Sequence, residues 1–252
     1  NMFFRTVRTY VMLVIEVLAK YRKMIISDEI REKDGEAAGD AYACEKAAEI
    51  VNNTLKRTGT NIIVEGADNI PKDRNFVLIA NHQSMLDIFA IVSTLNRPIG
   101  FIAKAELKKV PVLRKWMTSI GCVFMDRKDM RQSMQALIDG IKKVKAGDNM
   151  CIFPEGTRTD GPMLEFKAGS FKLATKSGAP ILPLTIDGSH TILEDNHFWI
   201  KKGTVKLTYH PIIETKGMPK DEQNTLAERV QEIVGSALKE EERFGKNKNI
   251  NS

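Results

Sequence analysis

The chain has 252 residues, of which 42% are hydrophobic, and a formal net charge of +6. This length and composition allow a buried core in one or two domains and exclude a wholly disordered chain, while the small basic excess favours anionic partners such as phosphates, lipid headgroups or nucleic acid. The three cysteines are far apart and form no C-x-x-C pair, which predicts neither a disulfide framework nor a thiolate metal site and favours a reducing compartment.

The first predicted element is an amphipathic helix over residues 2–24. Its longest uncharged apolar run, residues 10–15, is far shorter than the roughly 20 residues that span a bilayer. Such a helix fits two settings, a membrane interface or packing on the protein's own core. The apolar positions are Phe3, Val7, Val11, Val14, Leu18 and Tyr21, and the charged positions are Arg5, Arg8, Glu16, Lys20 and Lys23.

An acidic stretch over residues 27–40 is expected to be a turn or loop. A second helix is predicted from Ala41 to about Leu55, where small apolar residues form a narrow stripe, and Thr58-Gly59 ends it. The two helices would form an N-terminal hairpin over residues 1–58.

From residue 60 onward, short β-branched or aromatic runs alternate with helical patterns. Several runs are apolar at successive positions, as expected for strands covered on both faces. This alternation predicts an α/β domain over residues 59–245 with a mostly parallel central sheet of about seven strands flanked by helices, followed by a flexible tail at residues 246–252. The predicted strands are 61–64, 76–80, 99–103, 122–126, 150–153, 181–186 and 205–209, and the predicted helices are 84–95, 112–119, 130–145, 166–177 and 224–243.

Residues able to bind or react with ligands follow four of these strands. In open α/β sheets, ligands bind beyond the carboxyl ends of the strands, so these residues are expected to share one edge. The residues concerned are His82 and Asp87, Lys104, Arg127, and the PEGTRT run at 154–159.

His82 and Asp87 are five positions apart and would not face each other within one helix. They meet only if His82 lies in the turn before the helix and Asp87 in its first turn. The carboxylate then fixes the imidazole tautomer, and the second ring nitrogen remains available as a general base. The competing interpretation is structural, because Ser84-x-x-Asp87 also matches a helix capping box. No G-x-S-x-G elbow or Cys-His pair suggests a protein nucleophile, so a substrate hydroxyl is expected to attack.

The loop after strand 150–153 has the composition of an anion site. Gly156 allows close backbone approach, and the guanidinium of Arg158 matches a phosphate bidentately. Glu155 is expected to orient either Arg158 or nearby backbone rather than to act on substrate. A surface turn with an exposed ion pair is the alternative. Walker and G-x-G-x-x-G motifs are absent. The three remaining histidines lack metal-ligand spacing, and no metal site is predicted.

Four motifs together resemble those of the glycerolipid acyltransferase family, and in particular its bacterial 1-acylglycerol-3-phosphate acyltransferases. They are NHQSMLD (81–87), GCVFMDR (121–127), FPEGTRT (153–159) and ILPLTI (181–186). The resemblance covers about residues 60–212. The leading hairpin is similar to the one that anchors members of this family to membranes.

The resemblance implies transfer of an acyl chain from acyl-CoA or acyl carrier protein, as co-substrate, to the sn-2 hydroxyl of lysophosphatidic acid, with no cofactor. It implies a peripheral or monotopic location on the cytoplasmic face of the cell membrane, in contact with anionic lipids. His82 would be the base and Asp87 its orienting partner. The residues implied in binding the substrate phosphate are Arg158, Lys104, Arg127, Glu155, Gly156 and Thr157.

Three alternatives remain at this point. The acceptor could be glycerol-3-phosphate or another lysolipid, the enzyme could be a hydrolase in which His82 activates water, or the chain could be a membrane-docked module that binds phosphate lipids. Nucleic-acid binding is not expected, because the basic residues are not interleaved with aromatic ones and no recognition motif is present.

Overall fold

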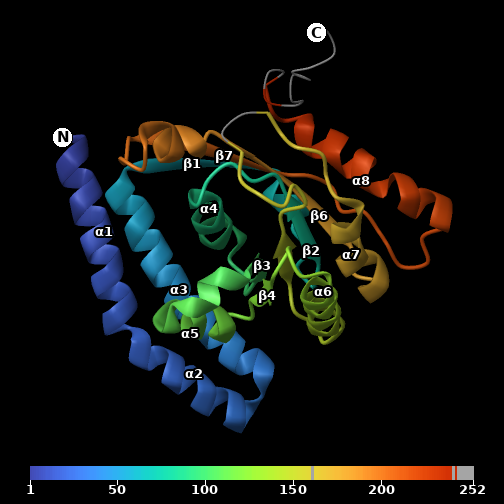
Figure 1. Cartoon of the computed structure of the whole chain (residues 1–252), viewed down its shortest axis with the longest axis horizontal. Helices are drawn as coiled ribbons and strands as arrows, with labels where there is room; N and C mark the ends of the chain where they lie inside the picture. The colour runs from blue at the N-terminus through green and yellow to red at the C-terminus, as the bar shows by residue number, and fades with distance from the viewer. Residues whose placement is uncertain (160–161, 240–241, 243–252) are drawn as a thin grey trace.

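The computed structural model describes residues 1–159, 162–239 and 242. A seven-stranded sheet lies between helical layers, which confirms the predicted α/β fold (Figure 1). The strand order is β1-β7-β6-β2-β5-β3-β4. The strands are β1 (Thr60–Glu65), β2 (Val77–Ala80), β3 (Gly100–Lys104), β4 (Val123–Met125), β5 (Met150–Ile152), β6 (Ile181–Asp187) and β7 (Gly203–Tyr209).

Five strands run in the same direction. β2 pairs in parallel with β5 and β6, and β3 pairs in parallel with β4 and β5. β7 is antiparallel to β6, and β1 runs parallel to β7, so these two strands point the other way. The carboxyl ends of β2, β3, β4 and β5 therefore meet at one edge of the sheet, as predicted.

The hydrophobic core is divided by the sheet into two clusters. All four residues of β2 are fully buried, with Leu78 and Ala80 in one cluster and Val77 and Ile79 in the other, as the two-residue period of a strand requires. The first cluster contains side chains of α3 (Glu36–Thr58) and α4 (Leu86–Leu95), and the second contains side chains of α6 (Met130–Lys145), α7 (Lys172–Ser177) and α8 (Lys220–Gly235). The sheet is thus covered on both faces.

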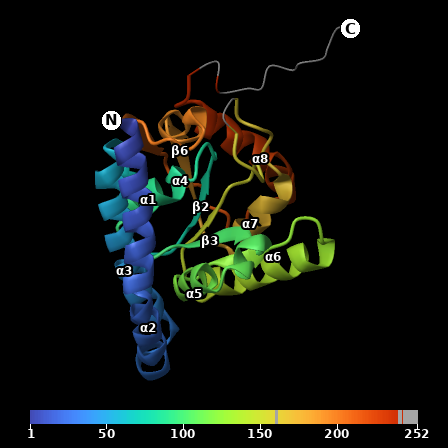
Figure 2. The ribbon, with the colours of Figure 1, turned by 60° about the vertical axis from the view of Figure 1, so that its left-hand side comes forward.

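The N-terminal hairpin is present, but its turn is far shorter than expected. One arm is α1 (Met2–Ala19) followed by α2 (Tyr21–Asp34), and the other is α3, with Gly35 between them at φ +98° (Figures 1 and 2). The expectation of a loop over residues 27–40 is therefore wrong. These residues are helical because their charges have partners, since Arg31 pairs with Asp28 and with Asp40 of α3. Within the part of the chain that the structure describes, we find no helix that combines the length and the hydropathy of a membrane span.

Two C-terminal expectations differ from the structure in extent. The helix predicted over 224–243 begins earlier, at Lys220, and α8 ends at Gly235. The helix predicted over 166–177 is a 3-10 turn, Ala168–Phe171, followed by α7. The tail predicted at 246–252 lies outside the described residues. The short helix α5 (Pro111–Ser119) packs Trp116 against the N-terminal hairpin.

Candidate active site

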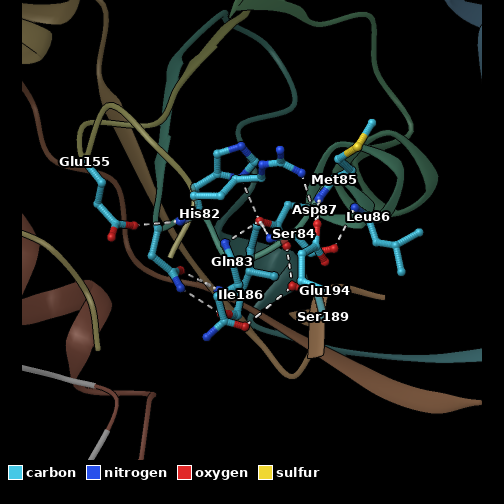
Figure 3. Close-up of polar contacts among 12 residues, drawn as sticks. His82, Gln83, Ser84, Met85, Leu86, Asp87, Glu155, Ile186, Ser189 and Glu194 are labelled. Atoms are coloured by element: carbon cyan, nitrogen blue, oxygen red, sulfur yellow. Dashed lines mark hydrogen bonds and ion pairs between the residues drawn. The ribbon is translucent and has the colours of Figure 1, made fainter. Parts of the chain in front are cut away.

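His82 lies in the turn that leaves β2, and Asp87 lies in the first turn of α4. Nδ1 of His82 is 2.7 Å from a carboxylate oxygen of Asp87 (Figure 3). The imidazole stacks on the ring of Phe153, with centroids 3.9 Å apart and planes 13° from parallel. Among the residues that the structure describes, none hydrogen-bonds Nε2 of His82. The pair therefore has the arrangement of an oriented general base with one free nitrogen.

The carboxylate of Asp87 is fully buried and accepts several hydrogen bonds. Oδ2 accepts from the backbone N–H of Gln83 and Ser84 as well as facing His82, and Oδ1 accepts from the hydroxyl of Ser189 at 2.5 Å. The bond from the Ser84 backbone is the one expected of a capping box. The capping and catalytic interpretations are therefore compatible, because one oxygen serves the helix start and the imidazole together.

Glu155 joins the two predicted halves of the site. Its Oε1 accepts from the backbone N–H of His82 at 2.7 Å, and its Oε2 accepts from the N–H of Leu164 at 2.8 Å. The side chain is buried, and this burial raises the pKa of Glu155 to about 7, although both backbone hydrogen bonds act in the opposite direction. Glu155 thus fixes the 153–159 loop against the backbone of His82, so of its two predicted partners it orients nearby backbone and not Arg158.

The raised pKa of Glu155 makes stability depend on pH. Below the unfolded-state pKa near 4.5, the carboxyl is neutral in both states, and it ionises first in the unfolded chain as the pH rises toward 7. We expect ionisation of this group to lower the free energy of unfolding by on the order of 3 kcal/mol as the pH rises from about 4.5 to about 7. Urea unfolding of wild type and Glu155→Gln at pH 4.5 and 7.5 measures it, since only the wild type carries the loss. Equal pH dependence in the two proteins would contradict the assignment.

Two cations converge on Gly156, which has φ +82°. A Cβ built on this glycine would lie 2.7 Å from Nζ of Lys167 and 3.3 Å from a guanidinium nitrogen of Arg127. We call Arg127 and Lys167 the cation pair. Both side chains are exposed, and no carboxylate of the described residues forms an ion pair with either one. The glycine therefore leaves room for two positive groups beside the His82 loop, an arrangement suited to an oxyanion.

Arg158 lies on the same loop but already has a carboxylate partner. Its guanidinium is 3.1 Å from Oε1 of Glu194, which also accepts from the backbone N–H of Met85 at 3.0 Å. Glu194 therefore ties Arg158 to the start of α4, within the segment that carries His82 and Asp87. The side chain of Arg158 remains about one-third exposed, which leaves donors for a ligand.

The remaining predicted residues are less closely joined. Lys104 lies at the carboxyl end of β3, in register with Met125, and Thr157 lies in the loop itself. Both are exposed, and among the described residues no hydrogen bond or ion pair links either of them to the site. Their roles in phosphate binding stay predictions.

Sequence reasoning missed three residues at the site, namely Lys167, Ser189 and Glu194. They come from segments far from 81–87 in the chain, and each is a common residue type outside the four motifs. One signal was available for Ser189, since it follows the motif strand 181–186 at the same sheet edge. Nothing in the sequence singles out the other two.

A second H-x4-D pair is also present, at His190 and Asp195. Nδ1 of His190 lies 2.9 Å from a carboxylate oxygen of Asp195, and Nε2 of His190 lies 3.6 Å from one of Glu242. Because both ring nitrogens face carboxylates, this histidine has no free nitrogen for a base. Within the described residues, no group of three or more His, Cys, Asp or Glu side chains is arranged to hold a metal ion.

Comparison with known proteins adds an independent line of evidence to this geometry. A family model described as "Acyltransferase" matches residues 61–187, about half of the chain. The chain belongs to the acyltransferase family. This acyltransferase is 30% identical, over 73% of its length and 74% of the relative's, to a 1-acyl-sn-glycerol-3-phosphate acyltransferase of Borreliella burgdorferi. It is also 35% identical, over 70% of its length and 69% of the relative's, to a probable 1-acyl-sn-glycerol-3-phosphate acyltransferase of Mycoplasma pneumoniae.

The fold of this acyltransferase is also similar to a solved structure. The crystal structure of the 1-acyl-sn-glycerophosphate (LPA) acyltransferase PlsC from Thermotoga maritima matches with a TM-score of 0.79 and 30% identity, over 92% of each chain. The likeness extends into the N-terminal hairpin, because coverage of this size includes more than the catalytic domain.

Proposed function

We propose that this acyltransferase transfers an acyl chain from acyl-CoA or acyl carrier protein to the sn-2 hydroxyl of 1-acylglycerol-3-phosphate, forming phosphatidic acid. The observation that carries the proposal is the junction at Glu155. The His82–Asp87 pair and the Gly156–Arg158 loop are held together by one carboxylate, so a small headgroup can reach both. The names of the similar proteins support lysophosphatidic acid as the acceptor.

In the proposed mechanism, Nε2 of His82 removes the proton from the acceptor hydroxyl as its oxygen attacks the thioester carbonyl. Asp87 stabilises the imidazolium that forms. The tetrahedral intermediate then expels the thiolate, which takes the proton from His82 and leaves as the free thiol. Acceptor, acyl group and proton balance without an acyl-enzyme, and the base returns to its starting state.

The proposal is tested by incubating the protein with a labelled acyl thioester and a panel of acceptor alcohols. Thiol release that requires lysophosphatidic acid, with phosphatidic acid as product, supports the proposal. Release with glycerol-3-phosphate or another lysolipid instead would change the acceptor. Thiol release without any acceptor would indicate a hydrolase, and no turnover would indicate a binding module.

The cation pair is proposed to bind the acceptor phosphate together with Arg158. We expect Lys167→Gln to raise the apparent KM for lysophosphatidic acid roughly tenfold while kcat changes little, because a charge-assisted hydrogen bond is lost but the base is intact. Steady-state kinetics with acceptor in mixed micelles measure this.

Lys172→Gln is the matched control, because Lys172 is an exposed lysine five residues further along. It should leave both constants unchanged. An unaltered KM in the Lys167 variant, or an equal effect of both substitutions, would remove Lys167 from the phosphate site.

We also propose that this acyltransferase docks on the cytoplasmic face of the cell membrane through α1. This helix has an unusual distribution of residues, because Thr6 and Thr9 are 5% and 1% exposed while Phe4 and Val14 are 70% and 57% exposed. A surface helix of a protein that is exposed only to water would bury its apolar face against the core. The reverse arrangement supports a helix that lies in a lipid interface, where amphiphilic acceptor and product are found.

A further inference from the structure

Aromatic residues of the catalytic domain extend the exposed apolar surface of α1. Residues 197–199, which we call the aromatic loop, carry Phe198 at 49% exposure and Trp199 at 41%. The ring of Trp199 is 5.8 Å from that of Phe3, and the Tyr10 hydroxyl donates to the carbonyl oxygen of Phe198 at 3.0 Å. Both ribbon views show the segment that contains the aromatic loop, drawn in orange, beside the N-terminal end of α1 (Figures 1 and 2). Two distant parts of the chain therefore build one surface.

The aromatic loop is held in a backbone conformation that non-glycine residues seldom adopt. His197 and Phe198 have φ values of +51° and +66°, in the left-handed region. Backbone hydrogen bonds maintain it, with the N–H of Phe198 donating to Leu193 at 3.0 Å and that of His197 to Glu194 at 3.1 Å. Backbone strain of this kind is concentrated at functional positions. Here it leaves two large aromatic side chains exposed to the solvent.

The surface is also indented. A groove of about 470 Å³ lies between α1 and the aromatic loop, and its lining includes Val7, Val11 and Phe198. Each of these side chains is at least 43% exposed. An open apolar groove with an aromatic rim suits hydrocarbon chains better than a flat polar partner.

The charges around this surface indicate the kind of partner. The only acidic residue of α1, Glu16, points inward and pairs with Arg57 of α3. Arg8 is exposed on α1, and Lys201 and Lys202 are exposed after Ile200, the residue that follows the aromatic loop. Tryptophan and tyrosine are enriched at membrane interfaces, and basic residues there are attracted to anionic lipids. The chemistry therefore fits the surface of an anionic bilayer.

We propose that the aromatic loop is a second membrane contact, which inserts into the same lipid leaflet as α1. The proposal rests on the membrane location given under the proposed function, and it adds a contact supplied by the catalytic domain itself. The segment that carries the loop also supplies Ser189, which contacts Asp87, and Glu194, which contacts Arg158. Insertion of the loop thus sets the catalytic pair and the phosphate-binding arginine at the level of the lipid headgroups.

Tryptophan fluorescence tests the proposal, because the chain has only two tryptophans and Trp116 is 6% exposed. The full-length protein is mixed with phosphatidylcholine and phosphatidylglycerol vesicles that carry bromine on their acyl chains, and binding is followed separately by sedimentation. We expect the wild-type emission to shift to the blue and to be quenched by bromine. The quenched component should be missing from Trp199→Phe, which removes an exposed side chain and spares the core.

A second variant measures the contribution to affinity. Phe198→Ser should weaken vesicle binding by roughly ten- to a hundredfold, because a large aromatic side chain no longer leaves water. Met134→Ser is the matched control, since Met134 is equally exposed but lies on α6, and its binding should be unchanged.

The outcomes separate this proposal from the one on which it rests. Binding to vesicles without quenching of Trp199 would overturn the aromatic loop as a membrane contact and leave α1 in place. Failure of the wild type to sediment with vesicles would overturn both. A dimer that persists in mild detergent and that Phe198→Ser dissociates, seen by sedimentation equilibrium, would assign the surface to a second copy of the chain and overturn the proposal.

Discussion

Replacing His82 with alanine is expected to lower kcat by about 10² to 10⁴-fold, the usual contribution of a general base. The protein should still fold, because the backbone N–H of His82, which donates to Glu155, is retained. The substitution removes the stacking contact between the imidazole and the ring of Phe153, but no other aromatic contact among the described residues. The KM for lysophosphatidic acid should change little, because the phosphate-binding groups are untouched. Single-turnover rates with a labelled thioester, together with circular dichroism, measure these effects.

The chain supplies its own control for this experiment. His190 shares the spacing and the hydrogen-bonded aspartate of His82, but both of its ring nitrogens face carboxylates. His190→Ala should therefore keep most of the transfer activity. If His82→Ala retained more than about a tenth of wild-type kcat, or if the His190 variant lost as much, the assignment of the base would be wrong.

Asp87→Asn separates the electrostatic role of Asp87 from its role in starting α4. An asparagine can keep its oxygen where Oδ2 accepts from Gln83 and Ser84, and the hydroxyl of Ser189 can turn to accept from the new amide. The helix start is preserved, but the negative charge that stabilises the imidazolium is lost. We expect kcat to fall by about 10²-fold or more while unfolding free energy falls by only about 1–2 kcal/mol.

Ser84→Ala is the companion variant, because it removes the hydroxyl that accepts from the backbone N–H of Leu86 without touching Asp87. It should cost about 1 kcal/mol of stability and leave kcat near the wild-type value. Urea unfolding and steady-state assays on both variants give the comparison. Full activity in Asp87→Asn would show that the carboxylate serves only the helix.

The placement of the site could be predicted because it depends on local patterns and one general rule. Short β-branched or aromatic runs located all seven strands, and the carboxyl-edge rule then brought together His82, Arg127 and the loop of Arg158. Pair spacing alone was not sufficient. The His82 and His190 pairs are identical in spacing, and only their surroundings distinguish them. His82 stacks on the ring of Phe153, whereas His190 faces a second carboxylate, that of Glu242.

The errors arose where structure depends on partners distant in the sequence. Residues 27–40 are polar and acidic, which is typical of a loop, yet they are helical. Asp28 pairs with Arg31 and also with Lys115 of α5, and Gly39 permits close approach of α3 to the Arg31 side chain. For the same reason Glu194 and Lys167 were not found, because their importance comes from contacts made only after the chain folds.

The orientation of α1 has a practical consequence. The hydroxyl of Thr6 accepts a hydrogen bond from the backbone N–H of Ile200, and Arg5 donates to the carbonyl oxygen of the same residue. The helix therefore cannot rotate about its axis to bury its apolar face without breaking these hydrogen bonds. Away from lipid, molecules with a fixed face of this kind adhere to one another or to detergent. Purification in plain buffer should accordingly yield soluble aggregates, and a mild detergent above its micelle concentration should disperse them without unfolding the enzyme.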